Sequence, residues 1–488
     1  MALTIIGGDD MTEKTFDIEK ENFSKWYNTI LKSANLIDIR YNVKGFVVYM
    51  PWAMKIIKRL YEMWERELEK TGHGPCLFPV VIPPENFEKE KEHIEGFEPE
   101  VFWITKAGKE KENLALRPTS ETAFYQMYSI WIRSYNDLPF KFYQSCAVYR
   151  HETKATKPLM RGREFLWIEA HNAFETEGEA LAQVKEDMKI TKNVYDKLGI
   201  PFIFFQRPEF DKFAGAVSTY AADTLMPDGK ILQLPSTHYL GQNFSKPFNI
   251  KFLDKNGKEK YPYQTCYGPP ISRTLAALIS IHGDKKGLIL PFDIAPVQIV
   301  IVPIIFEKTR KKVLECAKKL KNELSGFRVE IDASEKRPGE KFYYWEMKGV
   351  PIRIEIGPKD IEKKQVILVN RVAGKKTVKE KDLLKEIKKQ EKIILETMKD
   401  RANKSFNSMI TEADDIGDVE KIMNKNGGFV KINFCSIGND GRKCAEILKE
   451  KTGAEVRGIE LNKKEKPKGK CIVCGKPAKC VVYAGRAY

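Results

Sequence analysis

Two stretches of the chain, FYQSCAVYRHE at residues 142–152 and REFLWIEAH at residues 163–171, decide the fold. Both are strand-like, and the polar loop between them predicts an antiparallel hairpin. Because side chains alternate across a sheet, Phe165, Trp167, Glu169 and His171 share one face of the second strand. Two aromatic rings followed by a carboxylate and an imidazole suit the wall of a pocket for a small apolar ring that carries an amine. A strand half exposed to solvent would show the same alternation.

The hairpin lies in a long segment, residues 16–292, in which helical and strand patterns alternate. Pro51 suits the first position of a helix and Gly72 suits its end, with an apolar stripe of helical spacing between them. The apolar run at 76–82 predicts a strand, and Pro79 within it favours an edge or an interface. A further apolar helix is expected at 274–281, and the run at 288–291 closes this domain.

Two more regions follow. Residues 293–399 predict a compact α/β domain, with strands at 297–305, 327–331, 352–356 and 365–370 and helices at 307–324, 340–348 and 377–399. Residues 400–488 form a third region, which holds five of the nine cysteines. Residues 1–15 are expected to be a leader of unknown role, because they lack the features of a secretory signal.

Composition narrows the class of protein. A chain of 488 residues is too long for one core, and 42% apolar with 31% charged residues is typical of globular proteins. No run of eighteen apolar residues occurs, which argues against a membrane span. The net charge of +16 favours a nucleic-acid partner, although a lysine-rich composition can have other origins. Nine cysteines without a secretory signal favour a reducing, cytoplasmic location.

Charged residues mark both ends of the hairpin loop. Arg150-His-Glu152 ends the first strand, and Arg161-Gly-Arg163-Glu164 opens the second. This arrangement resembles motif 2 of the class II aminoacyl-tRNA synthetases. The resemblance implies that Arg150 holds the α-phosphate of ATP and the amino-acid carboxylate, a task that suits the planar guanidinium fork. It also implies that Glu152 contacts the adenine amino group and that Arg161 reaches the phosphate tail.

Two further motifs of this class occur in the expected order. Gly268-Pro-Pro-Ile-Ser272-Arg273 resembles motif 3, with Arg273 on the γ-phosphate and Ser272 as an added contact, although Pro-Pro departs from the usual glycine-rich spelling. The helix at 51–72 and the strand with Pro79 resemble motif 1, which builds the dimer interface of the class, so a homodimer is expected. The resemblance implies an antiparallel class II sheet flanked by helices, an α/β anticodon-binding domain, and a small C-terminal zinc-containing α+β domain.

Within the class, the pocket resembles that of prolyl-tRNA synthetases. Arg117-Pro-Thr119-Ser-Glu121 is similar to the loop that clasps the imino group of proline. Residues 233–245 resemble the segment that lines the proline pocket and the ATP ribose and phosphates, although many relatives have glycines after the glutamine. The implied proline contacts are Thr119, Glu121, Arg150, Phe165, Trp167, Glu169, His171 and His238. The implied ATP contacts are Arg150, Glu152, Arg161, Gln233, Ser236, Thr237, Ser272 and Arg273.

Two other interpretations stay open. One is a threonyl or glycyl synthetase, although no trio of His and Cys ligands for a catalytic zinc lies near Cys146 or Cys266. The short spacing between motifs 2 and 3 leaves no room for an inserted editing domain, as in archaeal and eukaryotic prolyl enzymes. The other interpretation is a non-catalytic tRNA-binding paralogue, against which the intact Arg150, Glu152 and Arg273 argue.

The resemblance implies a two-step reaction. The carboxylate of proline attacks the α-phosphate of ATP, giving prolyl-adenylate and pyrophosphate, and the 3′-terminal hydroxyl of tRNA(Pro) then attacks the adenylate. Arg150, Arg273 and Mg²⁺ would offset the charge on the phosphate oxygens. No residue has the pattern of an essential general base, so positioning and electrostatics are expected to carry catalysis.

The line from Pro338 to Arg353 resembles the anticodon-binding domain of this synthetase subgroup. The resemblance implies that Glu346, Arg353 and Lys375 read the paired guanines of a proline anticodon. Arginine and lysine donate to guanine O6 and N7, and a carboxylate accepts from guanine N–H groups. Ordinary surface charge is the alternative for each residue.

Two cysteine pairs, Cys435 with Cys444 and Cys471 with Cys474, suit tetrahedral Zn²⁺ held by four thiolates. Cys480 is a fifth candidate, but the first four match the structural zinc ligands of prolyl relatives. A site with four protein ligands has no open position, so a structural role is expected. The ending Gly485-Arg-Ala-Tyr488 resembles the family's C-terminal tyrosine, whose carboxylate tucks toward the active site; a frayed terminus is the alternative.

Overall fold

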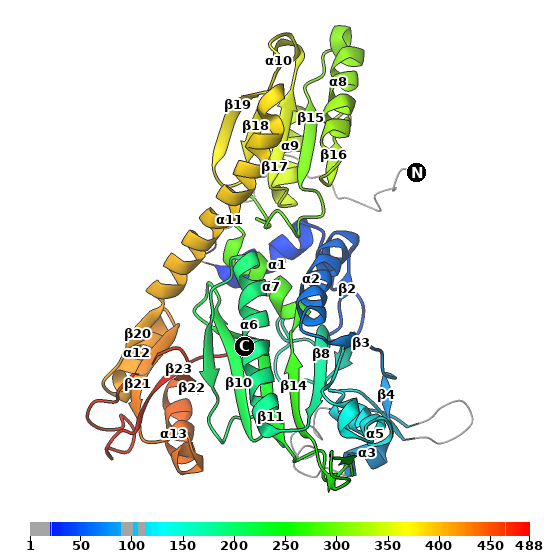
Figure 1. Cartoon of the computed structure of the whole chain (residues 1–488). Coiled ribbons are helices and arrows are strands. Elements are labelled where there is room, and N and C mark those ends of the chain that lie inside the picture. The colour runs from blue at the N-terminus through cyan, green and yellow to red at the C-terminus, as the bar shows by residue number, and fades with distance from the viewer. Residues whose placement is uncertain (1–19, 21, 89–100, 106–112, 464) are drawn as a thin grey trace.

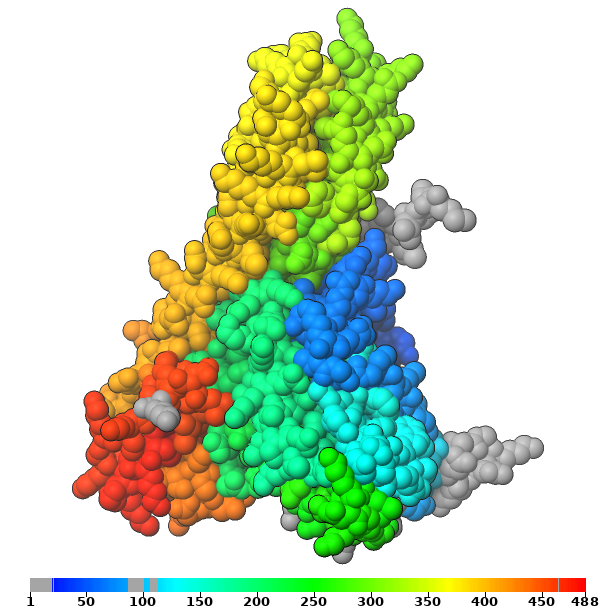
Figure 2. All heavy atoms as spheres, in the orientation of Figure 1, coloured from blue at the N-terminus to red at the C-terminus, as the bar shows by residue number. Residues whose placement is uncertain are grey.

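The computed structural model describes residues 20, 22–88, 101–105, 113–463 and 465–488, so the predicted leader at 1–15 lies outside it. Figure 1 shows an α/β domain at the top, a central domain on a large sheet, and a C-terminal domain at the lower left. Helix α11 (Leu383–Ser408) connects the first of these to the last, and Figure 2 shows it lying along the side of the central domain. Among the described helices, none is long and apolar enough to cross a membrane.

The predicted hairpin forms two neighbouring strands of the central sheet, next to its edge strand. Strands β7 (Phe140–Tyr149) and β8 (Glu164–Phe174) pair antiparallel, with Phe140 opposite Ala173 and Tyr149 opposite Glu164. Beyond β8 the sheet continues through antiparallel neighbours, whereas β3 (Gly74–Pro75) pairs parallel with β7 at the edge. These neighbours are β14 (Tyr263–Gly268), β11 (Ile231–Gly241), β10 (Ser218–Leu225) and β9 (Ile203–Gln206).

The sheet does not stop at the central domain. Strand β22 (Glu455–Glu460) pairs antiparallel with β9, with Ile459 opposite Gln206. The C-terminal strands thereby extend the central sheet to 11 strands, in the order β20-β21-β23-β22-β9-β10-β11-β14-β8-β7-β3. The remaining elements of this domain are β20 (Ile410–Glu412), β21 (Phe429–Phe434), β23 (Cys480–Gly485), α12 (Ile416–Lys425) and α13 (Arg442–Thr452).

Helices cover one face of the central sheet. Helices α6 (Glu177–Leu198) and α7 (Ile271–His282) pack on the strands, and α2 (Pro51–Glu69) packs on both helices. Pro51 occupies the first turn of α2, and Gly72 follows it with φ of +85°, as the sequence predicts. Ile168 and Ala170 of β8 enter the same core as Trp64 of α2. The alternate residues of β8 therefore face the other side of the sheet.

Shorter elements complete the central domain. Helix α5 (Glu121–Trp131) packs on the face opposite α6, where its rings contact Cys266 and Ala173. The others are α1 (Phe23–Ser33), β1 (Ile37–Asp38), β2 (Val48–Tyr49), β4 (Val81–Ile82), α3 (Pro84–Glu88), β5 (Phe102–Ile104), β6 (Leu114–Leu116), β12 (Phe252–Leu253) and β13 (Glu259–Lys260).

The second domain is the α/β layer that the sequence predicts. Its five-stranded sheet has the order β16-β15-β17-β18-β19, with parallel pairs around β15 and antiparallel pairs after β17. The strands are β15 (Ile299–Pro303), β16 (Val329–Ile331), β17 (Ile352–Ile356), β18 (Gln365–Asn370) and β19 (Gly374–Lys379). The helices besides α11 are α8 (Arg310–Glu323), α9 (Pro338–Met347) and α10 (Pro358–Glu362).

Two sequence predictions about elements are wrong in part. Only Val81–Ile82 of the predicted strand at 76–82 forms a strand, β4, which belongs to a small sheet with β6 and β5; β3, at Gly74–Pro75, precedes the predicted stretch and joins the central sheet. Proline lacks the N–H that a continuous ladder needs. The predicted helix at 377–399 instead begins at Leu383, after β19, and ends at Ser408. Lysines continue from β19 through the short turn at Glu380–Asp382 into the helix, which conceals the boundary in the sequence.

The C-terminus docks on the central domain. The main-chain N–H of Tyr488 donates to Ile231 O at 3.0 Å, and its hydroxyl donates to Asp228 at 2.6 Å. Lys157, from the loop between β7 and β8, donates to the same hydroxyl at 3.2 Å and lies over the ring. The terminus is therefore ordered by contacts to β11 and to the hairpin loop.

Candidate active site

A cavity of about 210 Å³ lies on the face of the sheet opposite α6 and α7. Phe165, Trp167, Glu169 and His171, the four residues that the alternation of β8 predicts to share a face, all line it. The rings of Phe165 and Trp167 meet edge to face, with centroids 5.4 Å apart. The cavity therefore has an aromatic wall beside a buried carboxylate and imidazole.

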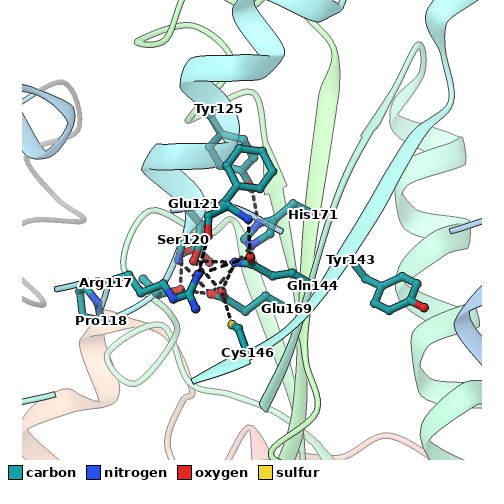
Figure 3. Close-up of polar contacts among 12 residues, drawn as sticks. Arg117, Pro118, Ser120, Glu121, Tyr125, Tyr143, Gln144, Cys146, Glu169 and His171 are labelled. Atoms are coloured by element: carbon teal, nitrogen blue, oxygen red, sulfur yellow. Dashed lines mark hydrogen bonds and ion pairs between the residues drawn. The ribbon is translucent and has the colours of Figure 1, made fainter. Parts of the chain in front are cut away.

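The Glu169 carboxylate is the centre of a buried hydrogen-bond network, drawn in Figure 3. It accepts from the Ser120 N–H at 2.8 Å, from the Ser120 hydroxyl at 2.6 Å and from Gln144 Nε2 at 2.9 Å. The side chain is only 2% exposed. Glu169 thus places a buried carboxylate, held by several donors, at the end of the aromatic wall.

A second carboxylate, that of Glu121, lies beside the first. The Thr119 hydroxyl donates to Glu121, and it also lies 3.0 Å from Glu169. A hydroxyl has one proton and can donate to only one acceptor at a time. Two buried carboxylates that share one hydroxyl proton suit a cationic ligand that brings N–H donors of its own. A protonated secondary amine has both the charge and the donors.

The imidazole of His238 closes another side of the cavity. Burial lowers the pKa of His238 to about 4, with Arg207 and His171 acting in the same direction against Glu121. Its ring nitrogens lie 2.9 Å from the Thr219 hydroxyl and 3.0 Å from the Ser236 hydroxyl. At neutral pH the ring is uncharged and serves as a fixed wall.

Arginine side chains line the opposite end. The Arg150 guanidinium carbon lies 5.3 Å from the ring centroids of both Phe165 and Trp167, and its Nε donates to Pro118 O at 3.0 Å. Arg273 donates to Met160 O at 3.0 Å and to Gln233 O at 3.3 Å. Burial, and then the nearby cations beginning with Arg150, lower the pKa of Arg273 to about 10. Such clustered cations are suited to bind a polyanion.

Arg161 and Glu152 lie next to this cationic end without lining the cavity itself. Arg161 Nε is 3.5 Å from a carboxylate oxygen of Glu152, and both side chains are largely buried. Arg163, by contrast, turns back and donates to the main-chain oxygen of Glu152. Arg161 thus places a cation of the loop between β7 and β8 beside the arginine end of the cavity.

Two predicted ATP contacts have side chains directed away from the cavity. Thr237 is fully buried, and its hydroxyl donates to Asp187 of α6 at 2.7 Å. The Ser272 hydroxyl accepts from the Leu166 N–H at 2.9 Å and is 2.9 Å from the Tyr49 hydroxyl. Thr237 alternates with Ser236 and His238, which line the cavity, and therefore lies on the helix side. Gln233 also lines the cavity because the strand pairing is irregular between Gln233 and Ser236. Both hydroxyls therefore hold the sheet and its neighbours in place.

The Asp187–Thr237 contact predicts a dependence of stability on pH. Burial raises the pKa of Asp187 to about 7, against hydrogen bonds from Thr237 and Gln183. The folded chain keeps this proton up to about pH 7, while the unfolded carboxyl loses it near pH 4. The difference in melting temperature between the wild type and Asp187→Asn should shift against the wild type as pH rises from about 4 to about 7. Above about pH 7 this difference should stay constant. Melting temperatures of both proteins measured across this pH range test the prediction. A difference between the two proteins that does not change with pH would contradict it.

The sequence did not single out several lining residues. Arg207, Asp211, Lys212 and Phe213 follow β9 and enter the cavity from one loop. Phe213 lies against the His238 ring, with centroids 4.6 Å apart. Two features of the sequence could have indicated these residues: Arg207 directly after a buried strand, and the aromatic Phe213 farther along the same loop. Loops that follow strands often carry binding residues.

Comparison with known proteins identifies the family. A model described as the tRNA synthetase class II core domain (G, H, P, S and T) matches residues 102–282, and one for an anticodon binding domain matches residues 298–390. A model for the C-terminal part of prolyl-tRNA synthetase matches residues 416–488. A proline–tRNA ligase of Thermofilum pendens is 55% identical over 98% of this chain and the whole of that protein. The chain belongs to the prolyl-tRNA synthetase family.

Other members of the prolyl-tRNA synthetase family are similar to this chain over nearly its full length. The proline–tRNA ligase of Pyrococcus abyssi is 44% identical over 96% of this chain and 98% of that protein. The solved structure of Giardia lamblia prolyl-tRNA synthetase in complex with prolyl-adenylate superposes with a TM-score of 0.92. It is 38% identical and covers 96% of this chain and 99% of that one. Class, fold and the proline–tRNA ligase function predicted from the sequence are therefore confirmed.

In this prolyl-tRNA synthetase a second cavity, of about 170 Å³, lies in the α/β domain and is lined by Glu346 and Arg353. Arg353 donates to Glu346 at 3.1 Å and to Glu355 at 2.9 Å, and it lies over the Phe342 ring. Lys375 is exposed on β19, directly after Gly374 at the cavity edge. The structure thus brings two of the three predicted anticodon readers into one cavity and leaves the third beside it.

The four predicted cysteine ligands also meet. Sulfur atoms of Cys435, Cys444, Cys471 and Cys474 all lie within 4.8 Å of one another. Thiolates at about 2.3 Å from a tetrahedral zinc ion are separated by roughly 4 Å, so the set fits Zn²⁺. Cys480 stands apart from the cluster, and its thiol donates to Phe434 O at 3.6 Å.

Proposed function

We propose that the 210 Å³ cavity performs both steps of the proline–tRNA ligase reaction, with the residues in the roles described below. The observation that carries this proposal is the order of groups along one cavity. A buried anionic pair, Glu121 and Glu169, lies at one end of the aromatic wall, and the guanidinium groups of Arg150 and Arg273 lie at the other. Proline has a cationic imino group and an anionic carboxylate, so it fits this polarity.

Proline would lie with its ring against the wall. Its imino N–H groups would donate to Glu121 and Glu169, while Thr119 keeps these carboxylates in place. The ring would contact Phe165 and Trp167 and be enclosed by the imidazoles of His171 and His238. Its carboxylate would point toward Arg150, whose position is fixed by Pro118 O and the two rings.

ATP would enter as its magnesium complex from the arginine end. Arg150 would hold the α-phosphate and Arg273 the γ-phosphate, with Arg161 on the phosphate tail, Glu152 at the adenine, and Gln233 and Ser236 along the strand. The described residues offer no cluster of carboxylate ligands at this end, so Mg²⁺ would arrive bound to the substrate phosphates. The ion would supply charge neutralisation there.

The first step is an in-line displacement. A carboxylate oxygen of proline forms a bond to the α-phosphorus as the bond to the bridging oxygen breaks, and pyrophosphate leaves. Arg150 and Arg273 stabilise the charge on the phosphate oxygens. In the second step the terminal hydroxyl of tRNA(Pro) bonds to the prolyl carbonyl carbon, and AMP leaves. Fixed positions and charges of this chain's residues account for both steps.

Trapping of the intermediate tests the proposal. Incubation with MgATP, labelled proline and pyrophosphatase should leave about one prolyl-adenylate per functional site on the full-length protein after gel filtration. Addition of a tRNA with a proline anticodon should move the label to the tRNA. Retention of no labelled proline, or label that no tRNA removes, would overturn the proposed function.

The second cavity is proposed to read the anticodon of tRNA(Pro), with Arg353 donating to one guanine, Glu346 accepting from another and Lys375 contacting the same segment. Each well-placed base contact contributes about 1–3 kcal/mol. Arg353→Gln should therefore lower kcat/KM for tRNA by about tenfold to a hundredfold and leave pyrophosphate exchange unchanged. The matched control is Arg310→Gln, because Arg310 pairs with Glu335 in the same domain but outside the cavity. Equal losses in both variants would contradict the assignment.

A homodimer is proposed from exposed apolar side chains in the N-terminal part of the catalytic domain, of which Leu77 belongs to motif 1. Ile39, Tyr41 and Leu77 are 64%, 60% and 76% exposed, and Trp103 of β5 is 45% exposed. Exposed apolar residues at such density favour burial against a partner. Light scattering of the full chain at micromolar concentration tests this stoichiometry.

A structural Zn²⁺ is proposed for Cys435, Cys444, Cys471 and Cys474, because all four ligands come from the protein. Cys471 and Cys474 lie in a tight turn in which the Gly475 N–H donates to Cys471 O. The nine cysteines are unpaired with one another, which supports a reducing, cytoplasmic location as part of the proposal. The division into domains at 16–292, 293–399 and 400–488 belongs to the same proposal.

A further inference from the structure

We propose that Arg457, in the C-terminal domain, is a positioning residue for the ATP end of the active site. Acting through Asp223 and Arg207, it fixes the orientation of the Gln233 side-chain amide. This inference rests on the proposed function in one respect, namely that Gln233 contacts ATP. It gives the C-terminal domain a part in substrate binding beyond the expected structural one.

The first link is a buried ionic triad across the domain boundary. Arg457 Nε donates to Asp223 Oδ2 at 2.8 Å, and its Nη2 donates to Oδ1 at 3.3 Å. Arg207 Nη2 donates to the same Oδ1 at 2.8 Å. Asp223 is 0% exposed, and both arginines are at most 5% exposed. The carboxylate is therefore shared by two guanidinium groups, one from each domain.

The second link runs from Arg207 to the cavity. Arg207 Nη2 lies 3.3 Å from Gln233 Oε1. A guanidinium group only donates, so it must meet the oxygen of the amide, and the amide nitrogen has to point elsewhere. That nitrogen has no acceptor among the described residues, and Gln233 lines the cavity. Its two N–H groups are left for an acceptor on the ligand.

The same residue also touches the cationic end of the site. The main-chain oxygen of Gln233 accepts from Arg273 Nη1 at 3.3 Å. Gln233 therefore joins the motif 3 arginine on one side to the Arg207–Asp223–Arg457 triad on the other. A change in the triad is therefore expected to reach the ATP end through Gln233, whose side chain meets Arg207 and whose main chain meets Arg273.

The charges explain why both arginines are needed. Burial would raise the pKa of Asp223, but the guanidinium groups of Arg207 and Arg457 hold it below its usual value. Without Arg457, the buried carboxylate would have one cation left. A guanidinium fork binds a single carboxylate through two parallel hydrogen bonds. Arg207 would then turn fully to Asp223 and release Gln233, whose amide could rotate.

The geometry of the sheet keeps the triad in register. Arg457 belongs to β22, which pairs with β9, and Arg207 directly follows β9. Arg207 Nη1 also donates to the main-chain oxygen of Arg457 at 2.9 Å. The two arginines are thus held side by side by the same strand pair that joins the domains.

Kinetics of the full-length protein test the inference. In proline-dependent pyrophosphate exchange, Arg457→Met should raise the KM for ATP by about tenfold and leave the KM for proline unchanged. Gln233→Met should show the same change. The double variant should be no worse than either single one, because both remove the same contact. Multiplicative effects in the double variant, equal rises in both KM values, or an unchanged KM for ATP would overturn the inference.

Two further variants separate positioning from loss of folding. Arg486→Met is the matched control, because Arg486 bonds to Thr452 O and Met423 O within the same domain and does not reach Asp223. It should lower the melting temperature without changing the KM for ATP. If Arg457→Met folds poorly, Arg457→Lys keeps the charge without the fork and should give a smaller rise. A wild-type protein without proline-dependent exchange would instead refute the proposed function.

Discussion

Arg150→Met will lower the rate of proline-dependent pyrophosphate exchange by about a hundredfold to a thousandfold, which is the usual cost of removing a donor to transition-state charge. The Arg150 guanidinium lies against the rings of both Phe165 and Trp167, and its Nε donates to Pro118 O. In the proposed complex this group contacts the proline carboxylate and the α-phosphate. Loss of this group should lower kcat and kcat/KM together.

The matched control for this prediction is Arg163→Met. Arg163 belongs to the same hairpin, but its guanidinium donates to Glu152 O and does not line the cavity. Its replacement should change exchange by less than about tenfold. Arg150→Lys keeps the charge and should recover only part of the rate, since lysine lacks the planar fork. An Arg150→Met variant as active as Arg163→Met would show that Arg150 has no special role.

Cys471→Ser will abolish binding of the proposed Zn²⁺ and destabilise the C-terminal domain by several kcal/mol, because metal affinity contributes directly to folding. Cys471 is 2% exposed and lies in the core with Cys444 and Phe434. Since β22 continues the central sheet, the change should also raise the KM for ATP. Metal analysis, melting curves and exchange kinetics of the full chain measure the three effects.

Cys480→Ser is the control for the zinc ligand. Cys480 is equally part of this core, but its sulfur bonds to Phe434 O and is not one of the four clustered atoms. The variant should keep one zinc ion per chain and melt close to the wild type. If Cys480→Ser lost zinc and Cys471→Ser retained it, Cys480 rather than Cys471 would be the zinc ligand.

Strand β8 carries the part of the site that could be predicted from the sequence alone. The alternation of Phe165, Trp167, Glu169 and His171 is local, because it depends only on strand geometry. The structure places all four on one wall, as predicted. The predicted anticodon readers Glu346 and Arg353 could be grouped from the sequence in the same way, since the helix and the strand that carry them follow one another closely.

Contacts between distant segments could not be predicted in the same way. Thr237 and Ser272 are adjacent to cavity residues in sequence, but neighbours in a strand point to opposite faces and neighbours on a helix point in different directions around its axis. Their true partners, Asp187 and Leu166, lie on other elements. The pairing of β22 with β9 joins residues far apart in the chain, and only this pairing brings Arg457 to Asp223.

The amino-acid specificity of ATP–pyrophosphate exchange by the full-length protein tests the central claim most directly. The cavity requires a small apolar ring with a cationic amine, so we predict the highest kcat/KM for proline. Alanine and cysteine should exchange weakly, because a hydrophobic pocket discriminates poorly against smaller residues. Threonine and glycine should remain near background. Highest exchange with threonine or glycine, or no exchange with any amino acid by the folded protein, would contradict the assignment of this cavity to proline.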